Sequence, residues 1–268
     1  MKAIQVHEHL RGIGTWIDWS HTCDGFHIGD PETELTGVAV AWISVLPALK
    51  EAHRLGCNMF VTHEPTFYMN PQGIFDLEVE PNKSKKSFLE KSGMVVYRCH
   101  DMWDVMPEIG ILDSWAKGLG LHQPPLATAK YYSVHESPAP TLGELARYVA
   151  EKIKSIRQET VQVIGNPNKR VSRIAIGTGA ITDAQTMYEL DPDALIVTDD
   201  GMYFWAAGAW AIDLELPMLI VNHPTAEEWG IANLAQYLAR QFTNVPVRHI
   251  HQGCMYDVVR AHTVIVES

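Results

Sequence analysis

Residues 59–65 read MFVTHEP, and this stretch decides the expected fold. The segment 58–62 is apolar or β-branched almost throughout, which predicts a short strand buried inside a sheet. Pro65 stops the strand, so His63 and Glu64 lie where the strand ends. In open α/β sheets, ligands bind at the carboxyl ends of the strands. The stretch therefore predicts a buried strand that carries two potential metal ligands to a site.

The alternation of strand and helix continues on both sides of this stretch. Residues 38–43 (VAVAWI) and 94–98 (MVVYR) predict further buried strands. Residues 46–55 predict a helix, because Pro47 suits a first helical turn and Gly56 suits the position after a helix. Apolar strands separated by helices indicate a mostly parallel sheet with both faces covered.

A second alternating block follows a proline-rich stretch. Thr141 with Glu144, and Thr225 with Glu228, match the S/T-x-x-E capping box, which predicts helices from there to about residues 156 and 242. Further strands are predicted at 173–176, 195–198, 218–222, 245–250 and 263–266, and further helices at 183–190 and 203–213. The chain is thus predicted to be an α/β protein throughout.

The composition is that of an ordinary globular protein with an acidic balance. The chain has 268 residues, 46% of them hydrophobic, and a formal net charge of −11. Such a charge disfavours nucleic-acid binding, which depends on attraction to phosphates, and suits a protein that uses carboxylates to bind cations. The lysines at 83, 85, 86 and 91 form a small basic run, which we assign to a solvated face, with contact to a substrate phosphate as the alternative.

Cysteine usage and hydropathy indicate a reducing, cytoplasmic setting without membrane insertion. Cys23, Cys57, Cys99 and Cys254 are far apart and form no C-x-x-C pair, which argues against a zinc ribbon or a dense disulfide scaffold. The first residues, MKAIQVHEHLRG, lack the apolar core of a signal peptide. No apolar run reaches the roughly 18–20 residues that span a bilayer.

Two further groups of histidine and carboxylate residues follow predicted strands. Residues 100–104 read HDMWD, and residues 223–227 read HPTAE. Each group also has a simpler interpretation, because acidic residues favour helix N-termini and a polar turn often ends a strand. Imidazole and carboxylate groups from three strand ends would also suit Zn²⁺, Mn²⁺, Fe²⁺ or Co²⁺. Together the groups predict a carboxylate-rich centre of two metal ions, bridged by Asp104 or Glu227.

In order and spacing, these motifs resemble the NIF-three-like family, also labelled dinuclear metal centre proteins or type-two GTP cyclohydrolase I homologues. Trp19 and residues 25–32 resemble the family's W-D-N-x-G-L-Q-x-G-D stretch. Residues 62–65 match its H-H-P motif, 100–104 its H-T-N-L-D motif and 222–227 its G-H-Y-x-x-E motif. The resemblance runs in order across most of the chain.

The resemblance implies the identity of the metal ligands. They fall on five residues: His63, Glu64, Asp104, His223 and Glu227. Two departures bear on the activity. Glu64 replaces the second histidine of H-H-P, which adds negative charge and favours harder metals. Trp205 stands where the family's T-G-[DE]-x-x-x-H stretch has its histidine, so an activity that depends on that histidine would be changed or lost.

The resemblance also implies two α/β lobes of mixed, mostly parallel sheets flanked by helices. Residues 1–125 with 222–268 would form the metal-binding lobe, and 126–221 the second lobe. Subunits of such proteins form a closed ring, often a hexamer, and symmetric closure is common in homo-oligomers.

Two functions follow from these patterns. The first is a metal-dependent hydrolase acting on a nucleotide or small phosphate ester, with His100 as a general base or as a group that orients a ligand. The second is a non-catalytic metal-binding or partner-binding protein. The departures at Glu64 and Trp205 favour this alternative, as do the aromatic side chains 203–205 if they are exposed rather than buried on a helix face.

Overall fold

The computed structural model describes residues 1–259, which form two compact α/β units. Unit 1 comprises Met1–Gly118 and Glu227–His251, and unit 2 comprises Leu119–Ala226 with residues 252–259. The division predicted from the sequence set the boundaries at 125/126 and 221/222 and gave the C-terminal segment to the first lobe. The strand predicted at 263–266 lies outside the described residues.

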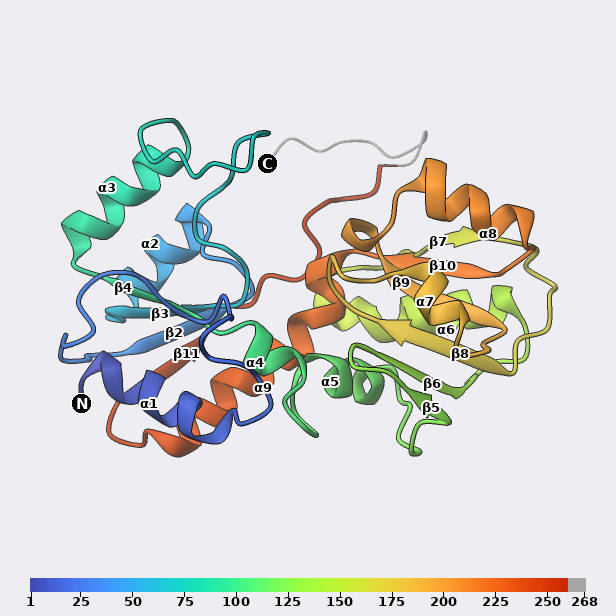
Figure 1. Ribbon diagram of the computed structural model, residues 1–268, viewed down its shortest axis with the longest axis horizontal. Coiled ribbons are helices and arrows are strands. Elements are labelled where there is room, and N and C mark those ends of the chain that lie inside the picture. The colour runs from blue at the N-terminus through green and yellow to red at the C-terminus, as the bar shows by residue number, and fades with distance from the viewer. Residues whose placement is uncertain (260–268) are drawn as a thin grey trace. The chain divides into compact units, whose positions relative to one another are not determined.

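Unit 1 is built on a five-stranded sheet with the order β1-β4-β3-β2-β11 (Figure 1). The strands are β1 (Gly25–Ile28), β2 (Val38–Ala41), β3 (Met59–Thr62), β4 (Val95–Arg98) and β11 (Val247–His249). The helices are α1 (Ala3–Ile13), α2 (Leu46–Arg54), α3 (Asn82–Ser92), α4 (Asp101–Asp104), α5 (Ile111–Gly118) and α9 (His223–Gln241), whose residues from Glu227 belong to this unit. Strands β11, β2, β3 and β4 are parallel, and β1 pairs antiparallel with β4.

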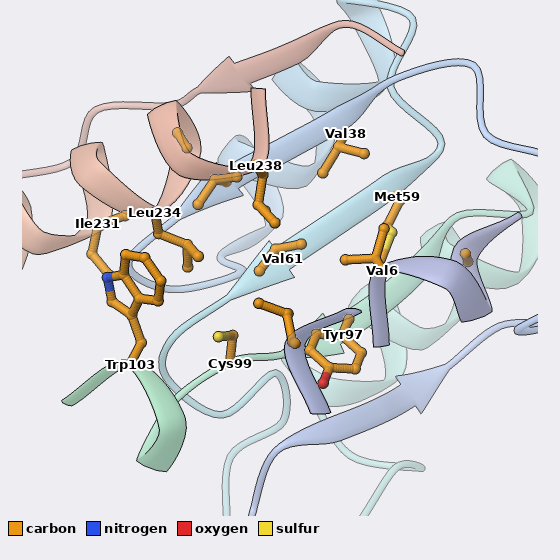
Figure 2. Close-up of a cluster of buried hydrophobic side chains, with 14 of the residues drawn as sticks. Val6, Val38, Met59, Val61, Tyr97, Cys99, Trp103, Ile231, Leu234 and Leu238 are labelled. Carbon is orange, nitrogen blue, oxygen red and sulfur yellow. The ribbon is translucent and has the colours of Figure 1, made fainter. Parts of the chain in front are cut away.

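Helices cover both faces of this sheet, which explains why its central strands are apolar on both sides. Alternate residues of β2 point to opposite faces, so Val38 and Val40 join one core cluster while Ala39 and Ala41 join another. Figure 2 shows the first cluster, in which strand side chains such as Val61 pack against α1 and α9. The second cluster packs the opposite face against α2 and α3.

The parallel register brings several strand ends to one edge of the sheet. Ala41 pairs with Thr62, and Thr62 pairs with Arg98. The residues that follow these pairs in sequence, His63 and Cys99 among them, therefore leave the sheet at the same edge. This edge is where the fold positions the candidate site.

Unit 2 contains a six-stranded sheet with the order β5-β6-β8-β9-β10-β7. Its strands are β5 (Ala127–Thr128), β6 (Tyr132–Glu136), β7 (Gln162–Ile164), β8 (Arg173–Gly177), β9 (Ala194–Thr198) and β10 (Met218–Val221). Its helical segments are α6 (Leu142–Ile153), α7 (Ala184–Tyr188), α8 (Ala209–Asp213), short 3-10 turns at Lys154–Ile156 and Asp199–Gly201, and a π-helix at Phe204–Gly208. Strands β8, β9 and β10 are parallel, whereas β5, β6 and β7 are joined to the sheet by antiparallel pairs.

The predicted fold class is confirmed, since both sheets are mixed and flanked by helices. The Thr141 cap is also confirmed, because its side chain accepts the backbone N–H of Glu144. The Thr225 cap is wrong, because α9 begins at His223 and Thr225 is buried within the helix. The Asp199 carboxylate, 2.9 Å away, accepts the N–H of His223, and Pro224 has no N–H to satisfy, so the helix can begin earlier.

The prediction that the lysine run 83–91 lies on a solvated face is wrong for Lys85. This residue is only 1% exposed, because its side chain turns inward from α3. Across residues 1–259, the structure shows no helix long and apolar enough to cross a membrane. The four cysteines form no disulfide.

Candidate metal centre

His63 leaves β3 fully buried at the centre of the sheet edge in unit 1. Its backbone N–H donates to the carbonyl of Trp42, 3.0 Å away, which continues the pairing with the neighbouring strand. Its ring Nδ1 lies 3.0 Å from the carbonyl oxygen of Cys99, which follows β4. A carbonyl can only accept, so Nδ1 carries the hydrogen and Nε2 is the lone-pair nitrogen of the neutral ring.

The Nε2 atom of His63 faces two carboxylates. It lies 3.3 Å from Asp104 Oδ1 and 3.3 Å from Glu227 Oε2. Within the described chain this buried atom has no hydrogen-bond partner of good geometry. Burial opposes a charged imidazole, but the negative charges of Glu227 and Asp104 outweigh burial and raise the pKa of His63 well above its usual value. This cluster of side chains thus attracts positive charge, either a proton or a cation.

These side chains fit a divalent metal ion. One nitrogen and two carboxylate oxygens, all within 4.8 Å of one another, form the set His63, Asp104 and Glu227. Imidazole and carboxylate are ligands of Zn²⁺, Mn²⁺ and Fe²⁺, and a cation among them would satisfy the buried Nε2 lone pair and both charges. The Cys99 carbonyl would fix the tautomer that such a ligand needs.

Trp42 orients the Glu227 carboxylate. The indole Nε1–H donates to Glu227 Oε2 over 2.7 Å, and both side chains are buried. A hydrogen bond to a buried carboxylate stabilises its charged form and fixes its direction. Trp42 follows β2, so three neighbouring strands supply groups to this cluster.

His100 forms the second layer of the cluster. Its ring stacks on the His63 ring, with centroids 4.4 Å apart and an interplanar angle of 20°. Its Nδ1 lies 2.9 Å from Asp101 Oδ1 and 3.5 Å from Asp104 Oδ2. The contact with His100 is the main reason that the pKa of Asp101 lies well below its usual value. His100 is therefore held by carboxylates on its Nδ1 side.

The backbone around His100 is held by Asp24. The N–H groups of His100 and Met102 both donate to the Asp24 carboxylate, the second over 2.8 Å. Thr22 donates its hydroxyl to Asp101 over 2.8 Å. The segment before β1 thus fixes the short helix α4, which carries Asp104.

Glu64 belongs to a second set of possible ligands, together with His63 and His100. Its Oε1 lies 3.8 Å from His100 Nε2, and its Oε2 lies 3.6 Å from Arg98 Nη2. The side chains of Glu64 and Arg98 are only 14% and 13% exposed. The Glu64 carboxylate is thus accompanied by the Arg98 guanidinium.

His223 is the first residue of α9, one helical turn before Glu227. Residues four apart lie on the same face of a helix, so α9 directs the two side chains to the same side. Within unit 2, His223 Nδ1 lies 2.9 Å from Asp200 Oδ2, and His223 is a buried residue, 4% exposed. Its role as a metal ligand stays a prediction.

The aromatic side chains at 203–205 are exposed. Tyr203, Phe204 and Trp205 are 71%, 52% and 82% exposed, at the start of the π-helix of unit 2. The interpretation as a buried helix face is therefore wrong. Trp205, the most exposed of the three, presents its ring to solvent.

The α/β fold and the buried imidazole–carboxylate cluster define a class of protein with a candidate metal site at the strand ends of one unit. A family model described as Duf34/NIF3 (NGG1p interacting factor 3) matches residues 3–253, and the chain belongs to this family.

Known proteins that resemble the chain agree with this assignment. A GTP cyclohydrolase 1 type 2 homolog from Chlamydia pneumoniae is 22% identical, over 82% of this chain and 85% of its own length. A hypothetical protein from Staphylococcus aureus superposes with a TM-score of 0.80 at 20% identity, over 97% of this chain and 99% of its own. A Bacillus cereus protein related to NIF3 gives a TM-score of 0.73 at 14% identity, with 99% of each chain covered. At these identities the solved structures establish the fold alone.

Sequence reasoning did not single out Trp42 or Arg98. Their contacts to Glu227 and Glu64 join residues far apart in the chain, so no local spacing reveals them. A signal did exist for Arg98, because a charged residue that ends an otherwise apolar strand and precedes His100 by two positions is unusual. A polar residue at a strand's carboxyl end is a candidate for the site.

Proposed function

We propose that this protein is a hydrolase that depends on divalent metal ions and acts on a nucleotide or small phosphate ester. The arrangement of His63 Nε2, 3.3 Å from both the Asp104 and Glu227 carboxylates, carries the proposal. A buried imidazole lone pair between two carboxylates is costly unless a proton or cation lies among them. The name of the Chlamydia pneumoniae relative, a GTP cyclohydrolase 1 type 2 homolog, also supports an enzyme.

Each residue of the cluster has a separate role in the proposed reaction. His63, Asp104 and Glu227 would hold the first ion, with Trp42 orienting Glu227 and the Cys99 carbonyl orienting His63. When bound, such an ion supplies a nucleophilic water at neutral pH and polarises a phosphoryl oxygen. His100, whose Nδ1 is held by Asp101, offers Nε2 to take a proton from the attacking water.

We also propose that a second divalent metal ion binds beside the first. Glu64 offers a carboxylate beside the first set, and His223 is carried on α9 one turn ahead of Glu227. Two positive ions repel each other, and a carboxylate shared between them reduces this repulsion. Asp104 and Glu227 are the candidates for that bridge. Zn, Mn, Fe and Co are the metals we propose, with Glu64 favouring the harder ones.

Metal content and hydrolysis, measured together, test the proposal. Purified protein is analysed for elements, stripped with chelator and reloaded with Mn²⁺, Zn²⁺ or Co²⁺. Hydrolysis of nucleotides and phosphate esters is then compared between wild type and Glu227→Gln. We expect one to two ions per chain and turnover in wild type, with both reduced in the variant. Glu32→Gln, which changes an exposed carboxylate that pairs with Lys2, is the matched control. Protein that binds no divalent metal would overturn the proposal.

The exposed aromatics Tyr203, Phe204 and Trp205 support the alternative of a metal-binding protein that acts by binding a partner. Exposed aromatic clusters often anchor interfaces. Under this alternative, metal-loaded protein shows no turnover on any phosphate ester, and a partner captured by wild type is lost with Trp205→Ala but retained with Glu227→Gln.

The proposal also covers the cellular location of the protein and its assembly into oligomers. We propose a cytoplasmic protein, because its four cysteines are unpaired. We also propose a homo-oligomeric ring, which light scattering on purified protein tests directly.

A further inference from the structure

Arg98 ends β4 at the same sheet edge as the candidate metal ligands of unit 1. It pairs in register with Thr62, the residue before His63. Its Nε–H donates to the His63 carbonyl over 2.9 Å, which ties the guanidinium to the backbone of a proposed ligand. Its side chain is 13% exposed, so it is largely buried yet still reaches solvent.

The terminal nitrogens of Arg98 retain donor capacity. The nearest Glu64 oxygen is 3.6 Å from Nη2, which is an ion-pair distance and too long for a hydrogen bond. A guanidinium carries five N–H donors in a planar fork, and among the described residues only the Nε–H has a hydrogen bond of good geometry. The remaining donors can bind a planar pair of oxygen atoms.

The charges around Arg98 indicate the kind of ligand. Glu64, Asp104 and Glu227 make this edge strongly negative, so an anionic substrate needs positive charge to enter. A bound metal ion supplies part of that charge, and Arg98 is a fixed cation beside it. A phosphoryl group has enough oxygens to contact a metal ion and a guanidinium fork at the same time.

We propose that Arg98 binds the phosphoryl group of the substrate beside the metal site, and that this protein's substrate is therefore a phosphate ester with an exposed terminal phosphoryl group. The proposal rests on the metal-dependent function above. Glu64 then has a second role, because its carboxylate holds the guanidinium near the ligands when no substrate is bound. A nucleotide or a simpler phosphomonoester would both offer this group.

Inorganic phosphate is the probe that tests the proposal. Its affinity for Mn²⁺-loaded protein is measured by calorimetry, with elemental analysis of each sample, for wild type, Arg98→Gln, Arg98→Lys and Arg54→Gln. Arg54 is the matched control, because it is an arginine of unit 1 that pairs with Glu51 on α2, away from the strand ends. Arg98→Lys keeps the charge beside Glu64 and removes the planar fork.

We expect Arg98→Gln to weaken phosphate binding about tenfold or more, as the loss of charge-assisted hydrogen bonds does. Arg98→Lys should weaken it less, and Arg54→Gln should bind as wild type. Wild-type affinity in metal-loaded Arg98→Gln would overturn the proposal, and so would an absence of phosphate binding in wild type. If Arg98→Gln does not retain its metal, phosphate affinity is compared between wild type and fully metal-loaded Arg98→Lys. Wild-type phosphate affinity in that variant would then overturn the proposal.

The two proposals fail in different ways. A protein that holds metal and binds phosphate through Arg98 but hydrolyses no ester contradicts the hydrolase and leaves the Arg98 site standing. A protein that hydrolyses phosphate esters, and whose Arg98→Gln variant matches wild type in both KM and phosphate affinity, contradicts the Arg98 site alone.

Discussion

His63 Nδ1 lies 3.0 Å from the carbonyl oxygen of Cys99, and this contact determines what the other side of the ring can do. With the hydrogen on Nδ1, Nε2 faces Asp104 and Glu227 as a base. The strand pairing produces this contact, because Cys99 donates its N–H to the Thr62 carbonyl over 2.9 Å and so brings its own carbonyl alongside the ring. The sheet register thus sets the tautomer of a proposed metal ligand.

Trp42→Phe should lower both metal affinity and stability. The change removes the 2.7 Å hydrogen bond from the Trp42 indole to the buried Glu227 carboxylate, and a hydrogen bond to a charged group typically contributes about 1.5–3 kcal/mol. Metal affinity is measured by competition with a chromophoric chelator, and stability by urea unfolding. Trp115→Phe is the control, because its buried indole nitrogen has no hydrogen-bond partner among the described residues. Equal metal affinity in the two variants would contradict the orienting role of Trp42.

Metal binding should raise the unfolding temperature of wild type and not that of Asp104→Asn. A ligand that binds only the native state at 100 times its Kd stabilises it by about 2.7 kcal/mol. Thermal unfolding is followed by circular dichroism in excess Mn²⁺ and in chelator. Asp213→Asn, at the exposed end of α8, serves as the control and should shift as wild type does. The prediction fails if Asp104→Asn shows the same metal-induced shift.

The central strands of both sheets could be predicted from the sequence, because the pattern that identifies each strand lies within the strand itself. Strands such as β3 and β10 are apolar runs that end in polar residues, and both are present. The strands β1, β6 and β7 lack such a pattern, since their burial depends on neighbours that only the fold supplies. Apart from the edge strand β11, which was predicted at 245–250, strands at or near the sheet edges are therefore the part of the sheets that sequence reasoning missed.

The candidate site was predictable only where its residues follow strands directly. His63 and Asp104 lie in motifs that also resemble a known family, and the structure brings them together with Glu227. The contacts of Trp42 and Arg98 depend on tertiary packing between distant segments. The helix start at His223 depends likewise on the Asp199 carboxylate, which is remote in sequence.

Gly230→Ala should destabilise the protein and weaken metal binding. An added Cβ would lie 2.9 Å from the backbone Cα of Ile111, so α9 and α5 would have to separate. Overpacking of this kind typically costs about 1–3 kcal/mol, and α9 also carries Glu227. Gly12→Ala in α1 is the matched control, because its Cβ meets nothing within 4 Å, and it should stabilise by up to about 1 kcal/mol. Urea unfolding of both variants should show opposite signs.

Lys85 makes stability depend on pH in the alkaline range. Its ammonium donates to the Thr66 carbonyl and lies 4.3 Å from the centroid of the Tyr68 ring, and burial lowers its pKa from 10.5 to about 8. Between these two values the unfolded chain binds more protons than the native protein does. Native stability should therefore rise with pH across this window, by up to about 3 kcal/mol.

The comparison of wild type with Lys85→Met isolates this effect. Cys99, whose pKa is raised by burial, acts in the opposite direction as pH rises, but it is present in both proteins. The free energy of unfolding is measured in urea at intervals from pH 7.5 to about 10.5, the usual lysine range. The stability of wild type relative to Lys85→Met should increase across the series, because the variant has no charge to bury. A constant difference between the two proteins across the series would show that Lys85 keeps its ordinary pKa and would contradict the prediction.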